Sequence, residues 1–306
     1  MNTDAVIGAS AERQKIPRPD AASGADAGHS PDARKDWSDL GARIVSSLFL
    51  ASAGIGAAWV GGPWIAAAAG AAVVAMSYEW ARMSEPDAFT PAFLFALSGA
   101  LGAVMFASWR ELAWGLLWLA LCSAVSAVRR RSLTSVLETM LGALYIGAPC
   151  AVFVWLRGRQ PEGLETILTL FAVIWSADVF AYLGGKLIGG PKIARGLSPN
   201  KTWSGIILGV LAGMGAGFCC GLVFGAAAPG WIWLGVGALI AFTGLMGDLF
   251  ESFLKRRFGV KDASRLIPGH GGVLDRIDGL MAATLLTGAV LAFWPEVSAW
   301  LIGAGL

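Results

Sequence analysis

The sequence has few charged residues and almost no histidine. Charged side chains make up 14% of its 306 residues, and there are only 2 His. Soluble domains carry roughly a quarter charged residues. Hydrophobic residues make up 56% here, with 41 Gly and 14 Trp. This composition excludes an ordinary soluble domain and is typical of a polytopic helical membrane protein, with Trp at the interfaces and Gly where helices pack closely.

Other sequence features that are absent limit the kinds of reaction and site that the protein can have. All 4 Cys lie in apolar runs, without a His at metal-ligand spacing, which favours a packing role. No Ser-His-Asp order or Cys–His pair stands out, so a covalent enzyme intermediate is not indicated. The glycines of residues 184–190 lack the spacing of a Walker loop. No internal repeat is found, which disfavours a transporter built from repeated halves.

The chain divides into three predicted parts. Residues 1–41 are rich in Ala, Asp, Ser, Gly, Pro and Arg without an apolar period, so we predict a disordered tail. The tail lacks the form of a signal peptide. N-terminal transmembrane helices are expected over residues 42–160, and a C-terminal transmembrane catalytic region over residues 161–306.

Apolar segments follow one another from Arg43 onward, and we compare each with the roughly 20 residues that a span needs. The expected spans are residues 43–60, 63–82, 91–108, 111–128, 135–156, 164–186, 203–227, 230–254 and 275–302. We therefore predict an all-α, polytopic integral membrane protein with about nine transmembrane helices.

The basic residues of the predicted loops are distributed unequally. One side receives Arg129–Arg131 and the Lys and Arg residues of 186–201 and 255–265, while the other side receives three arginines. By the positive-inside rule the first side is cytoplasmic. The N-terminus and every polar motif then lie on the cytoplasmic side, which predicts a cytoplasmic-side active site.

The longest polar stretch of the apolar region runs from Gly247 to Asp278. It contains five carboxylates, six Lys or Arg and one His. Charge at this density beside membrane spans is costly and therefore indicates a functional site. Residues 268–272 are too rich in Gly and Pro for a helix. The stretch thus predicts two helix ends that carry acids, joined by a basic, glycine-rich loop.

The spacing of the polar residues adds detail. Four of them share one face of a helix: Asp248, Glu251, Ser252 and Lys255. Asp275 and Asp278 are spaced i, i+3 at the start of the next apolar run. Acids that can hold a divalent cation, beside basic residues and open backbone N–H groups, favour a phosphate-handling site.

A second polar region lies upstream. Asp178 sits within a predicted span, where an acid costs roughly 2.5–3.5 kcal/mol. It is either a metal or substrate ligand facing the bundle interior, or an acid that pairs with Lys186 or reaches the interface. Pro199 breaks any preceding helix, and Ser198 or Asn200 can cap the next one. Lys201 beside that helix N-terminus makes a phosphate cradle.

Two further residues have competing interpretations. Glu79, near the cytoplasmic end of a span, is either structural, paired with Arg82 or reaching water, or functional. His270 lies between glycines in the charged loop, where a buried structural role is disfavoured. The remaining histidine, His29, falls in the predicted tail and has no expected role.

Four of these acids cannot gather at one place without cations between them: Asp178, Asp248, Asp275 and Asp278. Mg²⁺ is the expected cation, because it prefers oxygen ligands and binds together with substrate phosphates. Basic residues nearby can neutralise charge that grows during displacement at phosphorus. The residues alone therefore predict metal-assisted phosphoryl or nucleotidyl transfer, with the base and the lipid unspecified.

One motif indicates a protein family as well as a type of chemistry. It combines Ser252-x-Leu254-Lys255-Arg256, Lys261-Asp262, Pro268-x-His270-Gly271-Gly272 and Asp275-Arg276-x-Asp278. This run resembles the signature of the phosphatidate cytidylyltransferases (CDP-diacylglycerol synthases). Residues 247–252 and 198–203 also resemble blocks of that family, and the close resemblance covers Asp178 to Asp278, about a third of the chain.

The resemblance implies an all-helical membrane enzyme that converts CTP and phosphatidic acid to CDP-diacylglycerol and pyrophosphate with Mg²⁺; a second cation is left open. It implies Asp248 and Asp275 as the metal pair. The predicted catalytic residues are Asp248, Asp275, Asp278, Lys255, Lys261 and His270. The predicted substrate-binding residues are Ser198, Asn200, Lys201, Thr202, Ser252, Arg256, Asp262, Arg276 and Asp178.

Two positions depart from the family pattern, because Ser204 stands where Glu is common and Gly185 where Arg is frequent. Expected partners are both substrates and membrane lipid, without nucleic acid, and a homodimer is left open. The expected location is a bacterial-type inner membrane, multi-pass, with a cytoplasmic N-terminus. There are three alternatives: a related enzyme with another lipid acceptor, a CDP-alcohol phosphotransferase and an anion transporter. The first stays open. The second is disfavoured because Asp278-Gly279 does not continue as the DGxxAR motif of the phosphotransferases.

Overall fold

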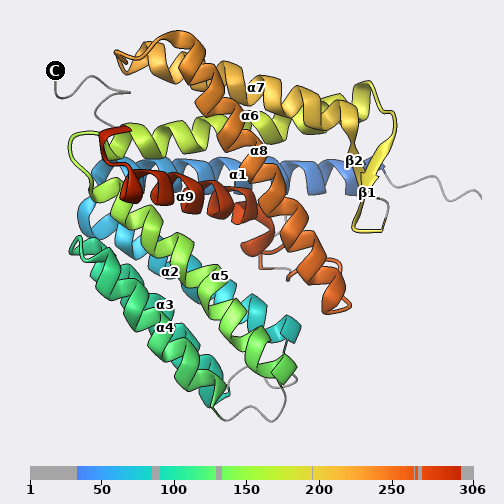
Figure 1. The fold of residues 1–306 in the computed structure, drawn as a ribbon. Coiled ribbons are helices and arrows are strands. Elements are labelled where there is room, and N and C mark those ends of the chain that lie inside the picture. Colours follow the sequence, from blue (N-terminus) through green and yellow to red (C-terminus); the bar gives the residue numbers. More distant parts are fainter. Residues whose placement is uncertain are drawn as a thin grey trace, which may run out of the picture.

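The computed structural model describes residues 33–84, 90–128, 133–194, 196–264, 266–267 and 271–297, and for residues 33–44 the backbone only. Within these ranges the chain forms nine α-helices and two short β-strands (Figure 1). The helices are α1 Ala33–Val60, α2 Gly62–Ser84, α3 Pro91–Ser108, α4 Leu112–Ala127, α5 Leu133–Gly158, α6 Gly163–Leu187, α7 Trp203–Val223, α8 Gly230–Arg257 and α9 Leu274–Phe293. The predicted helical architecture is confirmed.

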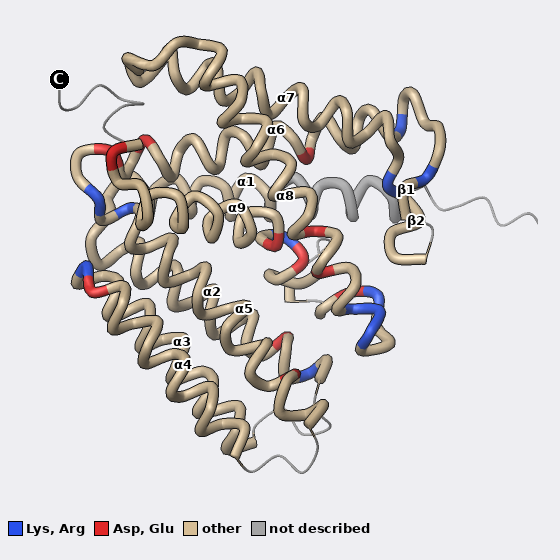
Figure 2. The backbone as a smooth tube through the Cα atoms, in the orientation of Figure 1, with Lys and Arg blue, Asp and Glu red and all other residues tan. Residues whose placement is uncertain are grey.

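Six of the described helices, α3 and α5 to α9, are long and apolar enough to cross a membrane. The segment Val45–Val60 of α1 and helix α4 are apolar but shorter. Figure 2 shows the described Lys, Arg, Asp and Glu residues mainly toward the helix ends, with long uncharged stretches between them. The chain is therefore a multi-pass membrane protein, while the number of nine spans stays a prediction.

The helices pack in two groups (Figure 1). In the first group, α3 and α5 pack against each other and against both α2 and α4. In the second group, α6, α7 and α8 each pack against the helix that follows in the sequence, so the group ends with α9. Helix α9 also packs against α5, and α1 contacts both α2 and α6. The second group carries most of the polar residues predicted for the site, and α5 and α1 join it to the first.

Helix α7 packs through a stripe of glycines spaced four residues apart. The five buried glycines are Gly205, Gly209, Gly213, Gly217 and Gly221. A Cβ at Gly205 would lie 2.7 Å from the carbonyl oxygen of Ala181 in α6, and one at Gly217 would lie 2.6 Å from that of Trp233 in α8. Small residues let membrane helices approach to backbone contact. The stripe therefore holds α6 and α8 against α7.

Two features differ from the sequence prediction. Helix α1 begins at Ala33, within the predicted tail, because Ala, Arg, Lys and Leu in this segment favour a helix; residues 1–32 lie outside the described residues. Between α6 and α7 the strands β1 (Lys192–Ala194) and β2 (Ser198–Thr202) form an antiparallel hairpin that we did not predict. Thr202, rather than Ser198 or Asn200, caps α7 by accepting the amide of Gly205 at 3.1 Å.

Substitutions at Gly237 and Gly235, both in α8, test the close packing of α7 against α8. An added Cβ at Gly237 would collide with the backbone of Gly213 and Met214, whereas one at Gly235 would meet nothing within 4 Å. We expect Gly237→Ala to lower the free energy of unfolding by about 1–3 kcal/mol. Gly235→Ala should be neutral or stabilising by up to about 1 kcal/mol, because alanine favours a helix. Thermal unfolding in detergent, followed by Trp fluorescence, measures both; equal midpoints would contradict the close α7–α8 contact.

Candidate active site

A cavity of about 1100 Å³ lies where the ends of α6, α8 and α9 meet β2 and the start of α7. One wall is apolar and built from small residues such as Ala177, Gly209 and Ala241. A second part of the lining, the charged wall, carries carboxylates and amines. A cavity with an apolar wall and a charged wall can hold a molecule that combines a lipid part with phosphate groups.

Helix α8 continues to Arg257, so its polar residues share one face as predicted. Asp248, Glu251 and Lys255 all line the cavity. Helix α9 lies close to this face because glycines stand at the contact: a Cβ at Gly247 would lie 2.7 Å from the carbonyl oxygen of Asp278. The close approach brings the first turns of α9 against the acidic face of α8.

Three carboxylates gather at this contact. Asp248, Glu251 and Asp278 each offer one oxygen atom, and these atoms lie within 4.8 Å of one another. Glu251 is 1% exposed and Asp278 is 9% exposed. Like charges at this separation, away from water, repel strongly unless cations lie among them. This acidic group, as we call these three residues, is therefore a candidate cation site.

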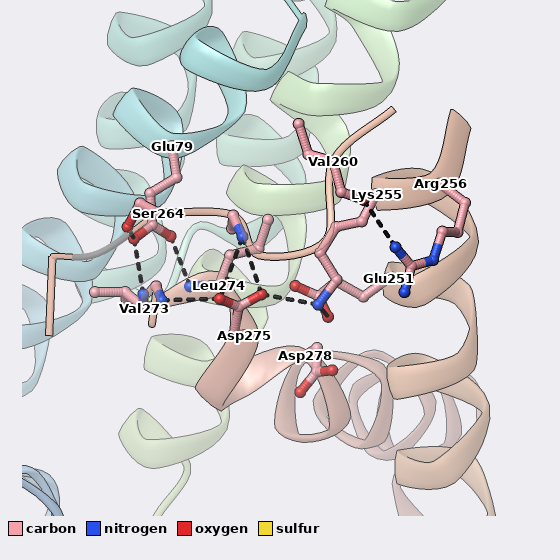
Figure 3. Close-up of polar contacts among 12 residues, drawn as sticks. Glu79, Glu251, Lys255, Arg256, Val260, Ser264, Val273, Leu274, Asp275 and Asp278 are labelled. Atoms are coloured by element: carbon pink, nitrogen blue, oxygen red, sulfur yellow. Dashed lines mark hydrogen bonds and ion pairs between the residues drawn. The ribbon is translucent and has the colours of Figure 1, made fainter. Parts of the chain in front are cut away.

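Two lysines compensate part of the negative charge. Lys201 of β2 pairs with Asp248 at 2.5 Å. Lys255 pairs with Glu251 at 2.7 Å and with Asp275 at 2.8 Å (Figure 3). The second carboxylate oxygen of Glu251 is buried and has no hydrogen-bond partner among the described residues. A buried carboxylate oxygen without a donor, beside two further carboxylates, fits the oxygen ligand set of a hard divalent cation.

Asp275 holds the loop that precedes α9. Its carboxylate accepts the amide of Gly272 at 2.8 Å and that of Ala263 at 3.3 Å, in addition to the amine of Lys255. The acidic group that the structure brings together thus contains Glu251 rather than Asp275. The difference arises because Asp275 directly follows the loop, where backbone amides take up its oxygens. A metal role for Asp275 stays a prediction.

The hairpin places β2 at the cavity. Lys192 and Asn200 line the cavity beside Lys201. Thr202 is 2% exposed, and its hydroxyl caps α7, so that part of the predicted phosphate cradle is already used within the protein. Ser204, one of the two departures from the family pattern, donates its hydroxyl to the carbonyl oxygens of Gly184 and Gly189 and so fixes the entry to the hairpin.

Most predicted site residues line the cavity. These are Asp178, Asn200, Lys201, Thr202, Asp248, Lys255, Asp262, Asp275, Arg276 and Asp278. Ser198, Ser252, Arg256 and Lys261 are not part of its lining. Arg256 donates instead to the carbonyl oxygens of Leu197 and Val260, and so joins the hairpin to the loop after α8. His270 lies outside the described residues.

Two acids belong to this region but were absent from the predicted site. Glu251 lies one turn after Asp248, and this spacing had placed it on the same helix face without a role in the site. Glu79 of α2 accepts hydrogen bonds from Ser264, Val273 and Leu274 (Figure 3). Its partners follow it by about 190 residues, so the neighbouring sequence holds no signal of this contact.

Fold and site together define a class: a multi-pass helical membrane protein with a buried acidic and basic site where its helices end. A sequence profile of the cytidylyltransferase family matches residues 41–294. A phosphatidate cytidylyltransferase from Brucella abortus is 38% identical over 260 residues, which cover 83% of this chain and 95% of the relative. The chain belongs to the cytidylyltransferase family and is an enzyme.

Further relatives carry the same name. A phosphatidate cytidylyltransferase from Rickettsia bellii is 36% identical over 171 residues, 52% of this chain and 70% of the relative. Another, from Staphylococcus aureus, is 39% identical over 142 residues, 46% of this chain and 54% of the relative. The resemblance inferred from the short motifs is thereby confirmed over most of the chain.

Substitutions of Lys255 and Arg257 test whether Lys255 compensates the buried acids of the site. The side chains of Lys255, Glu251 and Asp275 are 13%, 2% and 9% exposed, whereas Arg257 is 47% exposed where it pairs with Glu138. We expect Lys255→Gln to lower the free energy of unfolding by about 3–5 kcal/mol, because it leaves buried carboxylates without their amine. Arg257→Gln should cost at most about 1 kcal/mol.

Thermal unfolding of the two variants in the same detergent measures this difference. A Lys255→Gln variant as stable as Arg257→Gln would show that the lysine does not compensate the buried acids.

Proposed function

We propose that this protein transfers the cytidylyl group of CTP to phosphatidic acid and releases pyrophosphate, which yields CDP-diacylglycerol for phospholipid synthesis. The observation that carries the proposal is the cavity whose charged wall combines the acidic group with Lys201 and Lys255. Its apolar wall suits the lipid part of the acceptor. The names of the relatives, one of which aligns over 95% of its length, agree with this reaction.

The residues of the acidic group would hold Mg²⁺: Asp248, Glu251 and Asp278. Asp275 is kept as a proposed ligand from the family resemblance, and a second cation is left open. When bound, Mg²⁺ supplies positive charge to the triphosphate, which lowers the cost of charge on the pyrophosphate.

The reaction needs positioning and charge more than covalent chemistry. A phosphate oxygen of phosphatidic acid forms a bond to the α-phosphorus of CTP, and the bond between that phosphorus and the oxygen bridging to the β-phosphorus breaks. Lys201 and Arg276, both on the cavity wall, are placed to neutralise phosphate oxygens. Lys255 offsets part of the negative charge of Glu251 and Asp275 through its two ion pairs.

The apolar wall would receive the glycerol and the first carbons of the acyl chains. The small residues Ala177, Ala181 and Gly209 line this part of the cavity, where α6 and α7 pack closely together. The remaining chain carbons would stay in the membrane. The lipid phosphate would then lie at the level of the helix ends, near the amines of the site.

We further propose that the site faces the cytoplasm of a bacterial-type inner membrane, with the N-terminus on the same side. The hairpin and the end of α8, both rich in Lys and Arg, lie at the end of the bundle that carries the cavity (Figure 2). The positive-inside rule favours this orientation. A homodimer stays a prediction.

Release of pyrophosphate by purified protein tests the function. With CTP, phosphatidic acid and Mg²⁺ we expect lipid-dependent release that stops when the cation is chelated. Asp278→Asn should lower kcat by about 100-fold or more, because it removes a negative charge that would hold the cation. Glu138→Gln, which changes an acid of α5 that pairs with Arg257 away from the cavity, should stay within about twofold.

A panel of lipid phosphates identifies the acceptor. Phosphatidic acid should give the highest kcat/KM, and a water-soluble glycerol phosphate the lowest, because it leaves the apolar wall unfilled. Absence of release with every lipid phosphate, from a protein that unfolds cooperatively, would refute the proposed reaction.

A further inference from the structure

Glu79 joins the first group of helices to the start of α9 (Figure 3). Its side chain is fully buried, at 0% exposure. One carboxylate oxygen accepts the hydroxyl of Ser264 at 2.6 Å and the amide of Val273 at 2.8 Å, and the other accepts the amide of Leu274 at 2.8 Å. A single carboxylate of α2 therefore binds both the loop after α8 and the first turn of α9.

Helix α9 needs this acceptor because it has no cap of its own. The N-cap residue Val273 has an apolar side chain and makes no side-chain cap hydrogen bond. The first amide groups of a helix lack partners within the helix, and away from water each unpaired group is costly. Glu79 supplies the missing acceptor from another helix, and its negative charge suits the positive end of the helix dipole.

The surroundings of Glu79 fix its position. A Cβ at Gly272 would lie 2.8–2.9 Å from both carboxylate oxygens, so glycine makes room for this contact. Trp80, the next residue, is 6% exposed. Its ring packs against Phe258 at the end of α8, 5.4 Å between centroids, and against Tyr145 of α5 at 5.9 Å. The segment of α2 that carries Glu79 is thus held against α5 and the end of α8.

The first turns of α9 carry the acids of the site. Asp275 follows Leu274 directly, and Asp278 lies one turn further, where it meets Asp248 and Glu251. Glu79 itself is absent from the lining of the cavity. Any influence of Glu79 on the acidic group must therefore pass through the loop and the start of α9.

From these contacts we infer that Glu79 is a positioning residue for the acidic group. It fixes the position of α9 along its axis and the rotation about that axis, and so brings Asp278 against Asp248 and Glu251. The inference rests on the proposed function for its kinetic consequence, but cation binding and amide protection test it separately.

Two independent changes remove the contact. Glu79→Gln keeps the size of the side chain but loses its charge and one acceptor oxygen. Gly272→Ala keeps glutamate at position 79, but the added methyl group pushes its carboxylate away from the loop. The matched controls are Glu138→Gln and Gly196→Ala, since an added Cβ at Gly196 meets nothing within 4 Å.

Binding of Mn²⁺ to the purified protein without substrate, measured by electron paramagnetic resonance, reports on the acidic group. We expect the Kd for Mn²⁺ to rise at least about 10-fold in Glu79→Gln and in Gly272→Ala, because both release the helix that carries Asp278. The two controls should stay within twofold. Hydrogen exchange should accelerate at the amides of Val273 and Leu274 in the two test variants and stay unchanged in the controls.

Turnover adds a kinetic signature. Both test variants should lose about 10- to 100-fold in kcat, because α9 carries Asp278 of the acidic group. Glu79→Asp, which keeps the carboxylate one methylene shorter, should recover part of the Mn²⁺ affinity that Glu79→Gln loses. This partial rescue is the outcome that a purely structural loss of stability does not give.

Three outcomes decide the inference. Unchanged Mn²⁺ affinity and amide exchange in folded Glu79→Gln and Gly272→Ala would overturn it. Lower thermal stability with full Mn²⁺ affinity in the folded protein would also overturn it. A wild-type protein that releases no pyrophosphate, yet loses Mn²⁺ affinity with Glu79, would refute the proposed reaction and support the positioning role. Should Glu79→Gln fail to fold, Gly272→Ala and Ser264→Ala provide the same readouts.

Discussion

The mutual repulsion of three carboxylates is the constraint on which this structure depends. Asp248, Glu251 and Asp278 lie together at the end of an otherwise apolar bundle, and burial of Glu251 and Asp278 limits the screening of their charges by water. Each neighbouring element contributes something that makes this arrangement tolerable. Lysines approach from β2 and α8, glycines let α9 reach α8, and backbone amides engage Asp275. The same compensation produces a site that attracts a cation and phosphate groups.

The helices could be predicted from the sequence because most apolar segments are long and are separated from the next by glycine, proline or charge. The span expected over residues 203–227 corresponds to α7, Trp203–Val223, and that over residues 230–254 corresponds to α8, which runs to Arg257. The hairpin was missed for a physical reason. Its strands are short, Pro199 lies in one of them, and their polar residues give no clear alternation, so local sequence favours a loop.

The site was predicted in composition but not in every contact. Helical periodicity placed Asp248 and Lys255 on one face, and the structure has them there. Which acids share one place depends on the distance between α8 and α9, and this distance is set by glycines whose partners lie on the other helix. The family resemblance pointed to Asp275, whereas the structure groups Glu251 with Asp248 and Asp278. Glu79 required the full fold, because its partners come from the opposite end of the sequence.

The hydrogen bond between Glu79 and Leu274 joins residues 195 positions apart, and it has a consequence for biosynthesis. Helix α2 leaves the ribosome early, whereas α9 is the last helix of the described part. The carboxylate of Glu79 therefore lacks its partner in α9 until α9 has been synthesised and inserted. Until then the acids of α9 have not met those of α8, so a truncated or stalled chain has no assembled site. Assembly of the site therefore depends on insertion of α9.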